Sequence, residues 1–225
     1  MSGVSISEIA GRVQKQLHKI YEIETGEDVG EFLVTDPEVV SQIEAGQPGT
    51  RDIQEKLLVR DRGDELDLAL YIDPQVGERL AEADPTSRLD DTNFGDYLVL
   101  LEGVSHFTYL AWNAQRERPV TLLELELQAE VDKYVSCLFQ LSSQDGGRVP
   151  RRLKQVLFDG VVFDEQLDDA GLERYETANR VAMKYCARLE ERFLVRHRTR
   201  EMIDDVRRFY RLPQEAKLRA ATDAL

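Results

Sequence analysis

The chain has 225 residues, of which 42% are hydrophobic and 32% are charged. This composition is typical of a folded, soluble protein and excludes a mostly disordered chain, and the length suits one large domain or two small ones. The formal net charge of −14 disfavours binding to nucleic acid or anionic membranes and favours a basic partner.

The negative charge is concentrated in the first half of the chain. Residues 1–110 carry 23 acidic side chains and 9 Lys or Arg, whereas residues 111–225 carry 20 of each kind. The longest apolar run, residues 97–101, is far shorter than the roughly 20 residues that a membrane-spanning helix needs. The first residues also lack the pattern of a secretory signal. We therefore expect a cytoplasmic protein in which Cys137 and Cys186 are reduced packing residues.

Residues 1–90 predict a small acidic part that mixes helices and strands. A first helix is expected over residues 8–24 with Ser7 as its cap, followed by a short β-like run at residues 32–35. Asp-Pro pairs at positions 36–37 and 73–74 each predict a helix start, because Asp caps the first turn and Pro suits the first helical position.

A β-hairpin is predicted over residues 55–72, with its turn at residues 61–64. Leu66, Leu68, Leu70 and Ile72 alternate with polar or small residues, which is the period of a strand. We expect one face of this hairpin to be buried and the other to be exposed to solvent.

Residues 91–225 predict an antiparallel helical bundle, after a polar, breaker-rich segment at residues 84–92. Two long apolar segments, residues 94–116 and 120–141, are joined by a turn at Pro119. Further helices are predicted over residues 168–195 and 199–210, with shorter ones after Pro150 and Pro213 and a brief strand or apolar plug at residues 161–163. The fold class is therefore α+β and helix-dominated, with domains at residues 1–90 and 91–225.

A polar stripe interrupts the apolar helix at residues 94–116. Glu102, His106 and Asn113 project within about 40° of one another, and Glu102 can touch His106 four residues later. Glu124 lies on the apolar face of the next helix, so it either sits near an open end of the packing or has a partner. Bundle metal sites combine acids and histidines from facing helices. Glu102, His106 and Glu124 are therefore candidate ligands for Fe, Mn or Zn.

Two observations oppose the metal interpretation of this stripe. The paired Glu-x-x-His spacing of such sites is absent, and the chain has only 3 histidines. A solvent-facing or hydrogen-bonded polar stripe, with no cofactor, is the simpler hypothesis.

The basic tract at residues 184–211 is the second candidate site. It holds nine Lys or Arg and five acids, and its candidate binding residues are Arg196, Arg198, Arg200, Arg207 and Arg208. Contact with nucleic acid would use such a patch together with aromatic neighbours. Interspersed acids instead favour a solvated helix face, or docking against acidic residues of the first half.

No phosphate loop, dinucleotide fingerprint, zinc spacing or nucleophile elbow is present in the sequence. The sequence favours a non-catalytic interaction or regulatory protein that uses its bundle or its acidic surface to bind a protein partner or a second copy of itself. The alternative is a metal-dependent or acid/base enzyme with a polar site in the bundle. An enzyme would enclose Glu102 and His106 in an internal pocket, whereas a binding protein would expose an apolar or charged patch elsewhere.

Overall fold

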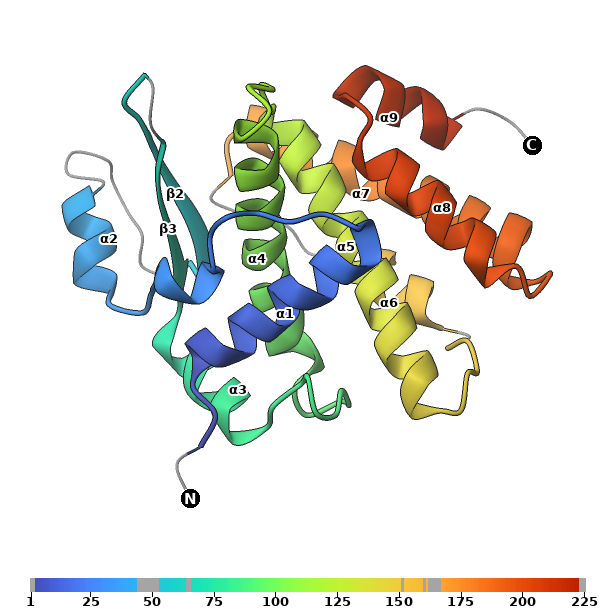
Figure 1. Cartoon of the computed structure of the whole chain (residues 1–225), viewed down its shortest axis with the longest axis horizontal. Coiled ribbons are helices and arrows are strands. Elements are labelled where there is room, and N and C mark those ends of the chain that lie inside the picture. The colour runs from blue at the N-terminus through green and yellow to red at the C-terminus, as the bar shows by residue number, and fades with distance from the viewer. Residues whose placement is uncertain are drawn as a thin grey trace. The chain divides into compact units, whose positions relative to one another are not determined.

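A computed structural model describes residues 3–43, 53–63, 66–150, 152–159, 161 and 167–222. The protein is a helix-dominated α+β structure with a small mixed sheet (Figure 1), which confirms the predicted fold class. Parts of the predicted hairpin turn at residues 61–64 and of the predicted strand or plug at residues 161–163 lie outside the described residues.

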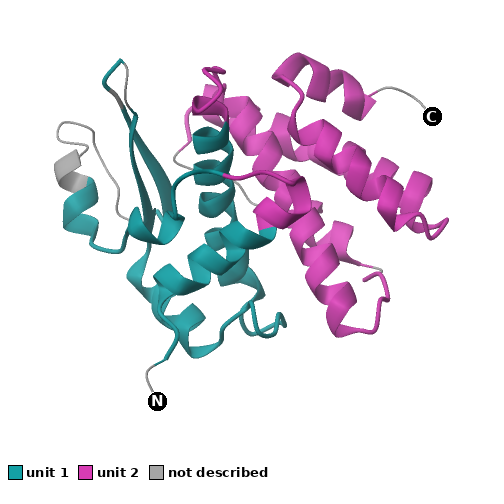
Figure 2. Ribbon diagram, in the orientation of Figure 1, with its two compact units in different colours: residues 1–16, 25–112 teal, residues 17–24, 113–225 magenta. Residues whose placement is uncertain are grey.

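The chain forms two compact units (Figure 2). Unit 1 comprises residues 1–16 and 25–112, and unit 2 comprises residues 17–24 and 113–225. The domain boundary predicted between residues 90 and 91 stays a prediction. The two compact units instead place residues 91–112 in unit 1 and residues 17–24 in unit 2.

Unit 1 is built on a three-stranded sheet with the order β1-β3-β2. Its strands are β1 (Leu33–Val34), β2 (Glu55–Asp61) and β3 (Leu66–Ile72). Strands β2 and β3 form the predicted antiparallel hairpin, with Leu57 opposite Leu70. Strand β1 runs parallel to β3. The predicted β-like run and hairpin are therefore both confirmed.

Both faces of the hairpin are buried at the end of β3, so the expectation that one face is exposed to solvent is wrong there. On one face Tyr71 packs with Leu58 and with Val40 of α2 (Pro37–Ile43). On the other face the fully buried Leu70 approaches α4 (Phe94–Ala114) at Gly103. Helices on both sides explain why Leu70, Tyr71 and Ile72 are buried in succession rather than in alternation.

Helix starts follow the predicted cap chemistry with one correction. In α1 (Ile6–Tyr21) the cap is Ser5 rather than Ser7, because the Glu8 amide donates to Ser5 Oγ (3.2 Å) and the Ser5 amide donates to Glu8 Oε2 (2.8 Å). This reciprocal pair is a capping box. Asp36 caps α2 and Asp73 caps α3 (Pro74–Glu82) as predicted.

Unit 2 contains the helices that follow residue 112, whereas α4, which was predicted to belong to the same bundle, falls mostly in unit 1. In unit 2 the long helix α5 (Leu122–Gln144) packs on α7 (Asp169–Leu189), which also packs on α9 (Gln214–Thr222). Helix α6 (Leu153–Phe158) contacts both α5 and α7, and α8 (Thr199–Tyr210) follows the end of α7. Cys137 and Cys186 are buried, unpaired thiols, and burial raises the pKa of Cys137 to about 12. No helix among the described residues is long and apolar enough to cross a membrane.

Candidate functional site

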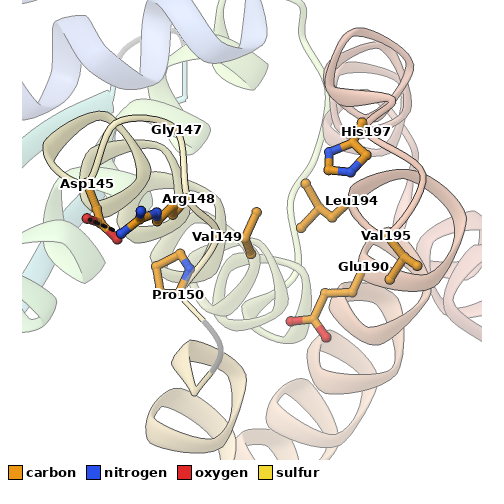
Figure 3. Close-up of a pocket in the computed structure, with 9 residues that line it drawn as sticks. All are labelled: Asp145, Gly147, Arg148, Val149, Pro150, Glu190, Leu194, Val195 and His197. Atoms are coloured by element: carbon orange, nitrogen blue, oxygen red, sulfur yellow. Dashed lines mark ion pairs between the residues drawn. The ribbon is translucent and has the colours of Figure 1, made fainter.

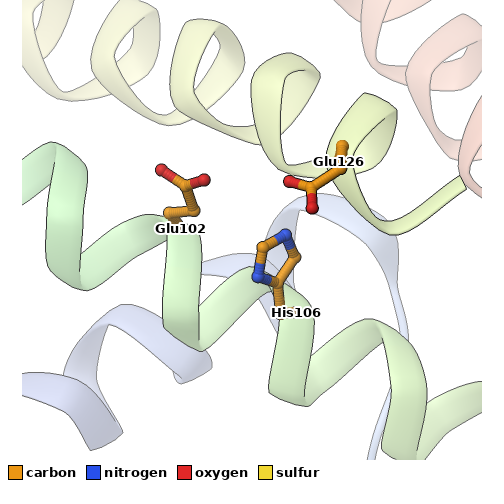
Figure 4. A group of neighbouring side chains, drawn as sticks. All are labelled: Glu102, His106 and Glu126. Carbon is orange, nitrogen blue, oxygen red and sulfur yellow. The ribbon is translucent and has the colours of Figure 1, made fainter. Parts of the chain in front are cut away.

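Glu102 and His106 lie on successive turns of α4 in unit 1, with their side chains on the same face of the helix (Figure 4). Their ligand-type atoms are within 4.8 Å of one another. A second carboxylate comes from Glu55 at the start of β2, whose Oε1 lies 3.8 Å from His106 Nδ1. The buried imidazole is therefore flanked by two carboxylates within unit 1. Figure 4 also draws Glu126, which belongs to α5 of unit 2.

Gly103 gives Glu55 access to this face of α4. A Cβ atom at position 103 would lie 2.7 Å from Glu55 Oε2 and 2.6 Å from a methyl carbon of Leu70, which is closer than packed atoms allow. A glycine inside an apolar helix often marks such a close approach. The sequence thus contained a signal for the contact, but it could not identify Glu55, which the sequence analysis missed.

Glu124 belongs to unit 2, where it is only 2% exposed and forms an ion pair with Arg118. Arg118 also donates to Asn113 Oδ1 (2.8 Å) and to the Leu212 carbonyl (3.0 Å). The position of Glu124 on the apolar face is therefore explained by a partner. The three predicted metal ligands fall into two groups, with Glu102 and His106 in unit 1 and Glu124 beside Arg118 in unit 2.

Several arginines of the basic tract in unit 2 form ion pairs with acidic side chains. Three of its five candidate arginines form ion pairs: Arg198 with Glu201, Arg207 with Glu22 and Arg208 with Asp205. Arg196 and Arg200 are exposed. This pattern matches the solvated, ion-paired helix face that the sequence favoured, and nucleic-acid contact through these arginines stays an untested prediction.

Two arginines of this tract bind the end of helix α1. Arg207 Nε donates to the Ile20 carbonyl (2.8 Å), and Arg211 Nη2 donates to the carbonyls of Tyr21 (3.0 Å) and Glu22 (3.1 Å). The last carbonyls of a helix lack intrahelical partners and carry partial negative charge. Part of the basic tract therefore has a structural role within unit 2.

Unit 2 also encloses a polar network that the sequence analysis did not identify. Lys217 of α9 is fully buried and donates to Gln128 Oε1, while Gln128 Nε2 donates to Asp132 Oδ1 (2.7 Å). The Tyr21 hydroxyl donates to the same Asp132 oxygen (2.5 Å). Lys217 Nζ lies 5.0 Å from the centre of the Phe209 ring, close enough for a cation–π contact.

Burial lowers the pKa of Lys217 to about 7, because loss of water disfavours the ammonium form. Arg118 acts in the same direction, whereas Glu124 and Asp132 oppose it. The buried hydroxyls of Tyr21 and Tyr210 also lie in this region, where their rings stack at 4.1 Å.

This lysine predicts a rise in stability with pH. In the unfolded chain Lys217 keeps its proton between pH 6 and 8.5, whereas in the folded chain it loses the proton near pH 7. The unfolded state then binds more protons, so the free energy of unfolding should increase by about 2 kcal/mol across this window. Urea unfolding at a series of pH values measures the increase.

Lys217→Met is the control for this prediction, since it should remove most of the increase. Equal slopes in the wild type and in this variant would contradict the assignment to Lys217. The window ends near pH 8.5 because burial raises the pKa of Cys137 and Cys186. Ionisation of those thiols in the unfolded chain opposes the trend at higher pH.

A cleft of about 960 Å³ opens in unit 2 between the loop after α5 and the end of α7 (Figure 3). One wall is formed by Asp145 and residues 147–150, and the other by Glu190, Leu194, Val195 and His197. Two apolar side chains of the cleft are open to solvent, since Val195 is 74% exposed and Val149 is 40% exposed.

The second wall of the cleft is shaped by an irregular helix end. Helix α7 continues as a π-helix (Glu190–Leu194), in which the Val195 amide donates to the Glu190 carbonyl (3.0 Å). Such wide turns are frequent at functional sites. The Glu190 carboxylate accepts hydrogen bonds from the Tyr134 hydroxyl (2.9 Å) and Lys154 Nζ (2.7 Å). These two hydrogen bonds hold the Glu190 side chain in place on the second wall of the cleft.

The chemical character of the cleft is mixed. Asp145 lies 3.8 Å from Arg148 in an exposed ion pair, and His197 and Glu190 stand on the opposite wall (Figure 3). The predicted metal ligands and the five candidate arginines do not line this cleft, but Glu190, Leu194, Val195 and His197 belong to the basic tract at residues 184–211. No family model matches the chain, and no curated protein or solved structure matches it.

Proposed function

We propose that the protein is a non-catalytic cytoplasmic binding protein, and that the cleft of unit 2 holds a segment of a basic partner protein. The observation that carries this proposal is the exposure of Val195 at a cleft of about 960 Å³. The cleft is separate from the stripe of Glu102 and His106 that an enzyme was expected to use.

Apolar contact at the cleft supplies part of the free energy of the proposed binding. Full burial of a valine side chain contributes about 1.5–3 kcal/mol relative to full exposure. Val149 and Val195 offer part of this gain to a partner that covers them, because both are exposed. An open cleft with apolar side chains at its walls suits a protein segment that inserts apolar residues of its own.

The overall charge favours a basic partner. The cleft is lined by two acidic residues, Asp145 and Glu190, and by Arg148 and His197, so the charge of the lining alone does little to select a partner. The whole chain carries −14, which attracts a basic protein over distance and speeds its association. Added salt should therefore slow association with this partner.

The cytoplasmic part of the proposal rests on the cysteines. Cys137 and Cys186 are unpaired and buried in unit 2, and unpaired structural thiols are typical of a reducing compartment.

Photo-cross-linking in cells tests the proposed binding. A photoreactive phenylalanine analogue at position 195 should give a discrete adduct with a second protein, since this side chain is exposed at the cleft. The matched control is position 122, where the leucine is 60% exposed at the opposite end of α5. Absence of an adduct at position 195, or the same adducts at both positions, would contradict the proposal. An adduct with a second copy of the chain would show that the cleft binds this protein itself rather than a different partner.

A further inference from the structure

We infer that the outer edge of strand β2 in unit 1 binds an extended segment of a partner protein, in which aliphatic and acidic side chains alternate. The segment would add a fourth strand to the sheet. In this mode of binding, main-chain hydrogen bonds supply affinity and alternate side chains supply specificity. The surface is independent of the cleft in unit 2, so either proposal can fail without the other.

Strand β2 lies at an edge of the sheet. The described strands have the order β1-β3-β2, so β2 has one neighbour, and its pairing with β3 is continuous along the strand. About half of the main-chain groups of an edge strand point away from that neighbour. Within the part of the chain that the structure describes, residues 57–60 form no main-chain hydrogen bond with an element other than β3. This stretch therefore presents donors and acceptors to which a further strand can pair.

An aliphatic patch lies beside this edge on one face of the hairpin. Val59 is opposite Leu68 and Leu57 is opposite Leu70, so these four side chains share a face. The face is fully buried at Leu70, where α4 covers it, but Val59 is 50% exposed. Leu66, on the same face, is 39% exposed. An added strand with aliphatic side chains next to Leu57 and Val59 would cover apolar surface that α4 leaves open.

The other face of β2 carries basic residues at the edge. Lys56 and Arg60 alternate with Leu58 on this face, and Arg60 is exposed. Opposite charges on directly paired residues of neighbouring strands attract each other. A segment with Asp or Glu at two positions four residues apart would place one acidic side chain beside each of these cations.

The same charges disfavour a second copy of the chain as the occupant. Two antiparallel β2 strands that overlap along their whole length would place Lys56 of each copy opposite Arg60 of the other. Like charges in directly opposite positions destabilise a strand pair. A shifted register would avoid these pairs only by leaving part of each strand unpaired. The occupant that fits this edge is therefore a different protein.

The peptide Thr-Glu-Val-Thr-Val-Glu-Thr is the probe for this edge. Its glutamates can lie beside Lys56 and Arg60 while its valines lie beside Leu57 and Val59. The sequence reads the same in both directions, so this pattern is kept in a parallel and in an antiparallel pair. Fluorescence anisotropy of the labelled peptide, titrated with the full-length protein, measures the dissociation constant. Binding should be saturable, and hydrogen exchange in the complex should slow at residues 55–61.

Matched controls separate strand addition from non-specific binding. One control peptide carries lysine in place of both glutamates. Another carries N-methyl groups on one valine and on the central threonine, which blocks both of its edges. Each should bind about tenfold more weakly than the parent peptide. In the protein, Arg60→Glu should weaken binding of the parent peptide by about fivefold or more. Lys15→Glu, the same change of charge at an exposed position of α1, should bind as the wild type does.

Three outcomes would overturn the inference. The first is that the wild type shows no saturable binding of the parent peptide up to about 1 mM. The second is that the N-methylated peptide binds as tightly as the parent. The third is that Arg60→Glu binds the parent peptide as tightly as Lys15→Glu does. If Arg60→Glu fails to fold, as judged by circular dichroism, the comparison of the three peptides on the wild type decides.

Discussion

Arg118→Ala is expected to lower the free energy of unfolding by about 3–5 kcal/mol, because it removes the guanidinium that pairs with the buried carboxylate of Glu124. Glu124 is 2% exposed and pairs with Arg118. The change also removes the guanidinium donor to Asn113 Oδ1 and to the Leu212 carbonyl. Arg118 thus joins the turn before α5 to the end of α8, and urea unfolding followed by circular dichroism measures its contribution.

The double variant Arg118→Met with Glu124→Leu separates the cost of an unpaired charge from the value of the pair. Apolar residues of similar size often replace a buried ion pair without loss, so the double variant should recover most of the stability that Arg118→Ala loses. A loss below about 1 kcal/mol in the single variant would contradict this account. A double variant as unstable as the single one would show that the charge of Glu124 is not the cause.

Leu127→Ala and Leu138→Ala should each lower the free energy of unfolding by about 2–5 kcal/mol, since each removes buried methyl groups and leaves a cavity. The two leucines lie on α5 and are 0% and 2% exposed. Leu122→Ala is the matched control on the same helix, because Leu122 is 60% exposed. The control should change stability by less than about 0.5 kcal/mol, and a similarly small change for Leu127 would contradict the role of α5 as the central core helix.

Much of the local structure was predictable because it depends on neighbours in the sequence. The apolar period placed α8 at residues 199–210, which matches its observed bounds. Alternation and turn residues likewise predicted the β2–β3 hairpin. Ser7 directly precedes the predicted helix start at residue 8, but the capping box of Ser5 with Glu8 starts α1 two residues earlier.

The candidate sites depend on contacts between distant segments, and these were less predictable. The four-residue spacing of Gln128 and Asp132 was a visible hint of a polar pair on α5, but their neighbour Lys217 lies far along the chain. Glu55 reaches His106 only because the strand β2 approaches α4. The cleft beside Val195 depends on a π-helix, which the helical period does not reveal.

The dissociation constant of the partner identified by cross-linking tests the proposed binding function most directly. It should be measured by calorimetry for the wild type, Val195→Asp and Leu122→Asp. Val195→Asp should weaken binding by about tenfold or more, equivalent to about 1.4 kcal/mol, because it places a charge in the apolar contact. Leu122→Asp, an equally polar change outside the cleft, should leave the constant unchanged. Equal constants for all three proteins would contradict binding at this cleft.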